Sequence, residues 1–116
     1  MIVSPQNAPE WRTMANFLHA HAMVQPSPDL TMIGWVEDDS LQIVAGLNGF
    51  IGKVAQIHIA FAPEWHFSPR LMLRAVFRYA FLDRKLKLLV GILNSNNERA
   101  MKFDKHLGFR ELLRLP

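Results

Sequence analysis

Residues 66–70 combine side chains that suit an anion site at the start of a helix. Ser68 can cap a helix, and Pro69 suits the first helical position. His66 and Arg70 stand on either side of this pair and can add positive charge. Because a helix N-terminus presents free backbone amides, a phosphate group could bind here. The Ser-Pro pair also serves simply to begin a helix, and both interpretations stay open.

Positive charge continues along the same segment. Arg70, Arg74 and Arg78 are spaced by four residues, so they form one stripe on a helix. Residues 1–65 contain two Lys/Arg and six Asp/Glu, whereas residues 66–116 contain eleven and four. This imbalance favours an anionic partner for the second half, and a solvated basic face is the alternative. No recognised nucleic-acid motif is present, so a nucleic-acid partner is disfavoured.

Other residue types exclude whole classes of chemistry. The chain has no cysteine, which excludes disulfides, thiolate nucleophiles and zinc–sulfur sites. His19 and His21 are two residues apart and face different sides of a helix, so we predict no metal site. The acidic residues 37–39 are typical of a solvated hairpin turn. Tyr79, the only tyrosine, is predicted to belong to the core.

Length and composition indicate one globular domain over residues 1–116. Half of the 116 residues are apolar, which suits a packed core. No apolar run approaches the roughly 20 residues of a membrane span, and the first residues do not resemble a signal peptide. The absence of cysteine fits a reducing compartment. The expectation is a soluble cytoplasmic protein that does not bind membranes.

Hydrophobic periodicity predicts the order of the elements as α, β-β-β, α, β, α, β. This order implies an α/β (α+β) fold with a mixed sheet flanked by helices. The strand at 86–93 is apolar apart from Lys87, so we expect it to be buried on both faces and central. The strand at 41–50 has a predicted bulge near Gly46 or Gly49. The predicted helices are 8–23, 68–85 and 96–107, and the predicted strands are 31–38, 41–50, 53–63, 86–93 and 109–115.

The last twenty or so residues carry a pattern that predicts a capped helix followed by a turn and a strand. Asn97 can cap the last helix, and Ala100 is small enough to let that helix lie close to a sheet or a ligand. Gly108 can end the helix in the left-handed conformation, and Phe109 then returns to the core. This Asn-x-x-Ala step with its Leu-Gly-Phe exit resembles the signature of the GCN5-related N-acetyltransferases. The resemblance covers roughly residues 31–115.

The resemblance implies an acyl-CoA N-acyltransferase-like fold with a mostly antiparallel central sheet. It also implies transfer of an acetyl group from acetyl-CoA to an amine by direct attack. The residues that it places at the cofactor are His66, Ser68, Arg70, Asn94 and Asn97. It places Pro69 and Leu71 where the family's phosphate loop has glycines.

A transferase of this kind needs a base for the amine. His58 and Glu64 are the candidates, because both lie on or just after the strand where the cofactor would run. The reference pKa of a histidine, about 6.5, suits a base. A single histidine on a half-buried strand can also be structural. Many family members carry a general-acid tyrosine at the position that Asp104 occupies here.

These departures support a second interpretation, in which the chain is a catalytically degenerate binding or structural module. The chain is short for the resembled family and is similar to some phage-encoded acetyltransferase-like proteins. Only one closing strand is predicted, which leaves an open sheet edge. Such an edge can pair with another strand, so a homodimer or a place in a larger assembly would bury it.

Overall fold

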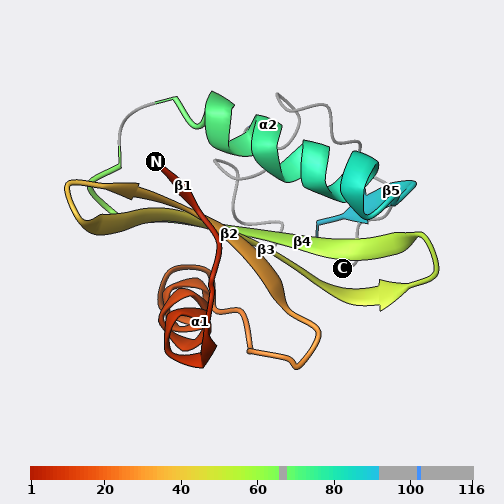
Figure 1. Ribbon diagram of the computed structural model, residues 1–116, viewed down its shortest axis with the longest axis horizontal. Coiled ribbons are helices and arrows are strands. Elements are labelled where there is room, and N and C mark those ends of the chain that lie inside the picture. Colours follow the sequence, from red (N-terminus) through yellow and green to blue (C-terminus); the bar gives the residue numbers. More distant parts are fainter. Residues whose placement is uncertain (66–67, 92–101, 103–116) are drawn as a thin grey trace.

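The computed structural model describes residues 1–65, 68–91 and Lys102, which form one sheet with a helix on each face (Figure 1). The described strands lie in the order β1-β2-β3-β4-β5. Pairing is antiparallel from β1 to β4, and β4 and β5 are parallel. The strands are β1 (Ile2–Val3), β2 (Thr31–Glu37), β3 (Ser40–Ile51), β4 (Val54–Phe61) and β5 (Leu88–Val90). The predicted mixed and mostly antiparallel sheet is therefore confirmed.

Helix α1 (Ala8–Ala22) lies across one face of the sheet, and the predicted helix at 8–23 is confirmed. Its N-cap is Asn7, whose side-chain oxygen accepts a hydrogen bond from the Glu10 amide at 2.9 Å. Pro9 lies in the first turn, where no intrahelical amide is needed. Met23 ends the helix in the left-handed conformation with φ 57°.

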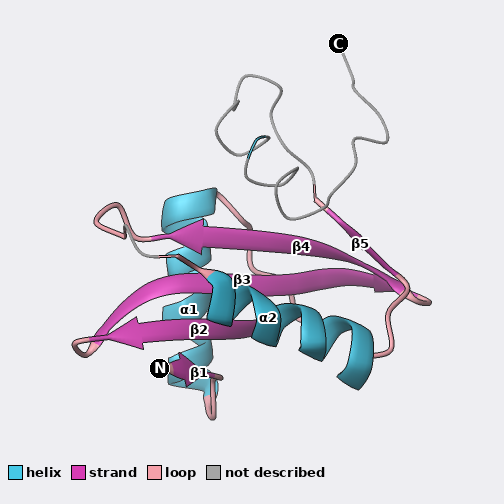
Figure 2. Ribbon diagram, turned by 90° about the horizontal axis from the view of Figure 1, so that it is seen from above, coloured by secondary structure: helices cyan, strands magenta, loops and turns pink. Residues whose placement is uncertain are grey.

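Helix α2 (Arg70–Arg78) covers the opposite face and continues as a π-helical turn, η1 (Tyr79–Asp83) (Figure 2). The predicted helix at 68–85 is confirmed in type, but its first residue differs. Pro69, not Ser68, occupies the N-cap position, and no side chain caps the helix there. The ring of Pro69 fixes its backbone just ahead of the first turn, which shifts the helix start by one residue.

Strand-level predictions are mostly confirmed. The register of β3 against β4 shifts between Asn48 and Ile51, and Gly49 there has φ 61°, so the bulge lies at Gly49 and not at Gly46. β1 was not predicted, because two residues carry no periodicity. Leu88 of β5 is 43% exposed, so the described part of this strand is not buried on both faces as expected. The predicted helix at 96–107 and strand at 109–115 lie outside the described residues.

The core has two halves, one on each face of the sheet, and alternation along β3 from Ile43 to Leu47 assigns residues to them. Ile43, Ala45 and Leu47 of β3 pack toward α2, whereas Val44 packs toward α1. Gly46 also faces α1, where an added Cβ would lie 2.8 Å from Leu18 Cδ1. The α2 half comprises Ile43, Ala45, Leu47, Ala55, Ile57, Met72, Val76, Ala80, Leu86 and Leu89. The α1 half comprises Met14, Ala15, Leu18, Val24, Leu30, Met32, Val44 and Ala60.

The described helices are not membrane spans. Neither the length nor the apolar character of any helix in the described ranges would let it cross a bilayer.

Candidate functional site

Four polar side chains form a continuous hydrogen-bonded row on the α1 face of the sheet. His58 Nε2 lies 2.8 Å from Asn48 Oδ1, and Asn48 Nδ2 donates to Ser27 Oγ at 3.3 Å. Ser27 Oγ donates to Asp29 Oδ1 at 2.7 Å. We call His58, Asn48, Ser27 and Asp29 the polar row. It connects β4, β3 and the loop that follows α1.

The backbone explains why these four residues meet. In the β3–β4 ladder, Asn48 pairs with Gln56 and Gly46 pairs with His58, so Asn48 and His58 are diagonal neighbours on one face. The bulge at Gly49 then aims two consecutive backbone amides at the loop. Asp29 Oδ2 accepts the N–H of Gly49 at 2.7 Å and that of Phe50 at 3.3 Å.

The direction of each hydrogen bond follows from the acceptor at the end of the row. An ionised Asp29 can only accept, so the Ser27 hydroxyl must donate to it. The Ser27 oxygen then accepts from the amide nitrogen of Asn48, which turns the Asn48 carbonyl toward His58. His58 Nε2 must therefore carry the proton, and the lone pair is left on Nδ1. No described residue hydrogen-bonds to Nδ1.

Two pKa shifts agree with this polarity. The pKa of Asp29 is lowered, chiefly by the hydrogen bond from Ser27. Desolvation is the next largest effect and opposes the shift, and the backbone amides of Phe50 and Gly49 lower the pKa further. Burial lowers the pKa of His58 below its usual 6.5. His58 is thus a neutral imidazole at neutral pH with one nitrogen available as a base.

This shift predicts how stability depends on pH. Because the pKa of His58 is lower in the folded state, the unfolded chain binds more protons as pH falls below 6.5. We expect the free energy of unfolding to be highest above pH 6.5 and to decline as pH falls from 6.5 through the lowered pKa. Urea unfolding at a series of pH values checks this, with His58→Gln as the control that retains the other histidines. An equal decline in both proteins would contradict the assignment to His58.

Glu64, the second predicted base, lies apart from the polar row. It follows β4 and is exposed, and its Oε1 accepts a hydrogen bond from Gln42 Nε2 at 3.4 Å. Gln42 is buried, and its backbone carbonyl accepts from the Ala62 amide at 2.7 Å. The structure therefore places His58 within β4 and Glu64 three residues beyond its end, each with its own side-chain amide partner.

The predicted anion site at the start of α2 is exposed. Ser68 Oγ accepts a long hydrogen bond from the Arg70 amide at 3.4 Å. Arg70, Arg74 and Arg78 are all exposed, as expected for one stripe on the outer face of α2. Leu71 is 59% exposed at the same helix start. His66, Asn94, Asn97 and Asp104 lie outside the described residues.

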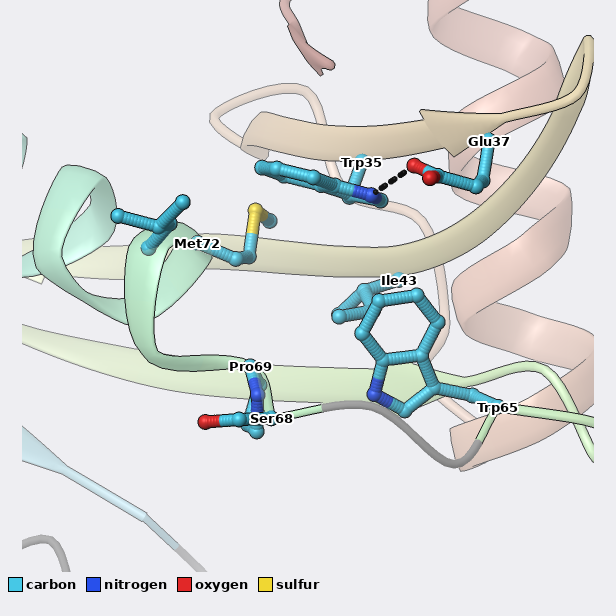
Figure 3. Close-up of a pocket in the computed structure, with 8 residues that line it drawn as sticks. Trp35, Glu37, Ile43, Trp65, Ser68, Pro69 and Met72 are labelled. Carbon is cyan, nitrogen blue, oxygen red and sulfur yellow. Dashed lines mark hydrogen bonds between the residues drawn. The ribbon is translucent and has the colours of Figure 1, made fainter.

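A cavity of about 230 Å³ opens on the α2 face, between the start of α2 and the strands β2 and β3 (Figure 3). Sequence reasoning named Ser68, Pro69 and Leu71 at the start of the helix, but it did not connect them with residues of β2 and β3. It placed Glu37 in a solvated turn. Trp35 and Glu37 are two residues apart on one strand, which was the one available signal that they share a face. The lining residues are Trp35, Glu37, Ile43, Trp65, Ser68, Pro69, Leu71 and Met72.

Metal-binding geometry is missing from the part of the chain that the structure describes. Residues 1–65 and 68–91, with Lys102, contain no group of three or more His, Asp or Glu side chains that could hold an ion. His19 Nδ1 lies 3.3 Å from the Val24 carbonyl oxygen, and the ring of His21 packs against Phe17 at 4.5 Å between centroids. Both histidines therefore have structural contacts.

Solved structures of N-acetyltransferases match the whole chain. A spermidine N-acetyltransferase chimera of Vibrio cholerae SpeG and hSSAT has a TM-score of 0.78 at 15% identity, over 99% of this chain and 84% of that one. Campylobacter jejuni N-acetyltransferase PseH, solved with acetyl coenzyme A, has a TM-score of 0.70 at 15% identity, over 99% and 92%. The aminoglycoside enzyme AAC(6')-Iy, solved with a bisubstrate analogue of CoA, has a TM-score of 0.75 at 13% identity, over 100% and 94%.

These likenesses define the class of fold. The chain has the fold of the GCN5-related N-acetyltransferases, as the closing sequence pattern predicted. At 13–15% identity the likeness establishes the fold alone. No protein-family model matches the chain, and no curated protein matches it in sequence.

Proposed function

We propose that this protein is an N-acetyltransferase that transfers an acetyl group from acetyl-CoA to an amine. The observation that carries the proposal is the match of the whole chain to N-acetyltransferases, two of them solved with acetyl-CoA or a CoA analogue. The start of α2 follows β4 by a short loop, and its amides and exposed Arg70 suit a phosphate group. The cysteine-free composition suits a cytoplasmic setting.

His58 is the base that we propose for the reaction. Its Nδ1 would take a proton from the ammonium form of the acceptor, and the neutral amine would then attack the thioester carbonyl of acetyl-CoA. The new C–N bond forms as the C–S bond breaks, and the CoA thiolate leaves with the bonding electron pair and is then protonated. The attacking nitrogen, which is positively charged once the C–N bond has formed, loses its one excess proton to solvent and becomes the neutral amide. Asn48, Ser27 and Asp29 would act as positioning residues, because they fix the tautomer of His58.

The cofactor residues that we propose are His66, Ser68 and Arg70 for the phosphates and Asn94 and Asn97 for the remainder of the cofactor. Glu64 is the alternative base. Its exposed carboxylate follows β4 directly, and its partner Gln42 orients it.

A degenerate module is the second candidate function, and a specific feature of the helix start favours it. Pro69 has no backbone N–H to offer a phosphate, and the exposed Leu71 side chain occupies the same turn. In that case a protein partner or a second copy could pair with a sheet edge. β1 pairs with only Gly34 and Trp35 of β2, so in the described residues β1 leaves Thr31–Ile33 of that edge uncovered.

Titration calorimetry with acetyl-CoA tests the proposal, with a thermal unfolding curve alongside. If acetyl-CoA binds, a concentration about 100-fold over its Kd should add about 2.7 kcal/mol to the free energy of unfolding. Arg70→Ala should weaken binding by about tenfold, because a charge-assisted hydrogen bond to phosphate contributes roughly 1.5 kcal/mol or more. Arg78→Ala, on the same stripe but two turns away, should bind like the unaltered protein.

Two outcomes would count against the proposal. If millimolar acetyl-CoA produces neither heat nor a thermal shift, the site at α2 does not hold the cofactor and the degenerate module is favoured. If Arg78→Ala weakens binding as much as Arg70→Ala, the effect reflects overall charge and not a site at the helix start.

A further inference from the structure

We propose that the cavity on the α2 face binds a small organic cation between the indole rings of Trp35 and Trp65. This site goes beyond the proposed base and its polar row, which lie on the opposite face of the sheet. It borders the start of α2, where we propose the cofactor phosphates, and it shares Ser68 with that site. Figure 3 shows the two indoles on opposite sides of the opening, with Met72 and Pro69 contributed by α2 and its preceding residue. Ile43 of the α2 core half forms part of the wall.

The cavity lining combines aromatic rings with a carboxylate, and both attract cations. Tryptophan faces attract cations more strongly than other aromatic rings do. Glu37 adds a carboxylate, and its Oε2 accepts a hydrogen bond from Trp35 Nε1 at 2.8 Å, which orients the acid and the ring together. The amino group of Met1 lies 3.9 Å from the same carboxylate oxygen, so a cation can approach Glu37 in this structure. The eight lining residues include one carboxylate and no basic side chain.

Size and charge narrow the class of ligand. A volume of about 230 Å³ is several times the share of one water molecule, about 30 Å³, yet below the roughly 300–1,000 Å³ of pockets for drug-sized ligands. The ligand should therefore have only a few heavy atoms. The Glu37 carboxylate favours a cation at the end of the cavity beside Trp35, and an alkylammonium or quaternary ammonium group fits both the rings and the charge.

The indole N–H signals of the three tryptophans provide the test in the protein without acetyl-CoA. Choline is the probe, and 3,3-dimethylbutan-1-ol, which has the same shape without the charge, is the matched control. We expect choline to shift the indole N–H signals of Trp35 and Trp65 and to leave the Trp11 signal unchanged. Trp11 lies on the other face of the sheet, where its Nε1 donates to the Leu30 carbonyl at 2.9 Å. Equal shifts with the neutral alcohol, shifts at all three tryptophans, or no shift would overturn the proposal.

Two variants separate the roles of charge and ring. Glu37→Gln retains an oxygen that can accept from Trp35, and it should weaken choline binding by about fivefold, the upper range for a half-exposed ion pair. Asp39→Asn, an exposed acid two residues away, is the control and should bind like the unaltered protein. Trp35→Leu should weaken binding by about tenfold, read from the Trp65 signal. Unchanged affinity in both Glu37→Gln and Trp35→Leu would overturn the assignment of the site.

Because choline binding is measured without acetyl-CoA, it does not depend on the proposed transferase activity. Binding of choline together with failure to bind acetyl-CoA would retain this site and reject the transferase. The reverse result would reject this site alone.

Discussion

Replacing His58 with glutamine should lower kcat/KM for acetyl transfer by about 100- to 10,000-fold, the usual contribution of a positioned base. Glutamine can still donate to Asn48 Oδ1, so the fold and the rest of the polar row should persist. It has no nitrogen lone pair that could accept a proton at neutral pH. Initial rates with acetyl-CoA and a panel of amines, followed by release of the CoA thiol, measure the effect.

The pH profile distinguishes a base from a structural histidine. Burial lowers the pKa of His58, so the rate of the unaltered protein should fall only on the acid side of 6.5, where the imidazole becomes protonated. His58→Gln should lose this acid limb along with the rate. If the limb persists in His58→Gln and disappears in Glu64→Gln, the base is Glu64 and the assignment made here is wrong.

The positioning residues should show a smaller effect of a different kind. Asn48→Ala removes the oxygen that accepts from His58 Nε2. The proton of the imidazole can then move to Nδ1, the nitrogen that should act as the base. We therefore expect kcat to fall by a larger factor than KM rises. An unchanged kcat in Asn48→Ala would show that the polar row serves the loop after α1 and not the reaction.

Replacing Leu18 with alanine should give the largest loss of stability in the described part of the chain, about 2–5 kcal/mol. Leu18 is fully buried between α1 and the sheet, where Gly46 leaves room for its side chain. Removing it opens a cavity that β3 cannot close, because a strand paired on both sides moves little. Urea unfolding followed by circular dichroism measures the change.

A double variant tests the fit between these two residues. Gly46→Ala alone should destabilise the protein by about 1–3 kcal/mol, since its Cβ would lie 2.8 Å from Leu18 Cδ1. In Leu18→Ala the same Cβ would fill part of the cavity, so the two losses should not add. Strict additivity would mean that α1 does not pack on Gly46 in solution.

Local patterns in the sequence were enough to predict most elements and the fold class. The alternation along residues 54–61 determined which side chains face each half of the core, because neighbouring strand residues point to opposite faces. The two glycines at positions 46 and 49 predicted a bulge without deciding between them, and the structure places it at Gly49, which has a positive φ. Among the described helices, the start of α1 was predicted at the right residue and that of α2 within two residues, because a proline restricts the backbone only locally.

Only the tertiary structure showed which distant side chains meet. Ser27 and Asn48 are 21 residues apart, and no local preference aligns the loop after α1 with the bulge of β3. That contact orients Asn48 and thereby the proton on His58, so the sequence could propose a base but not its tautomer. Trp35 and Trp65 lie on β2 and beyond β4, and they reach one cavity beside the start of α2. Periodicity assigns a residue to a face, whereas the packing of helices on that face decides what the residue touches.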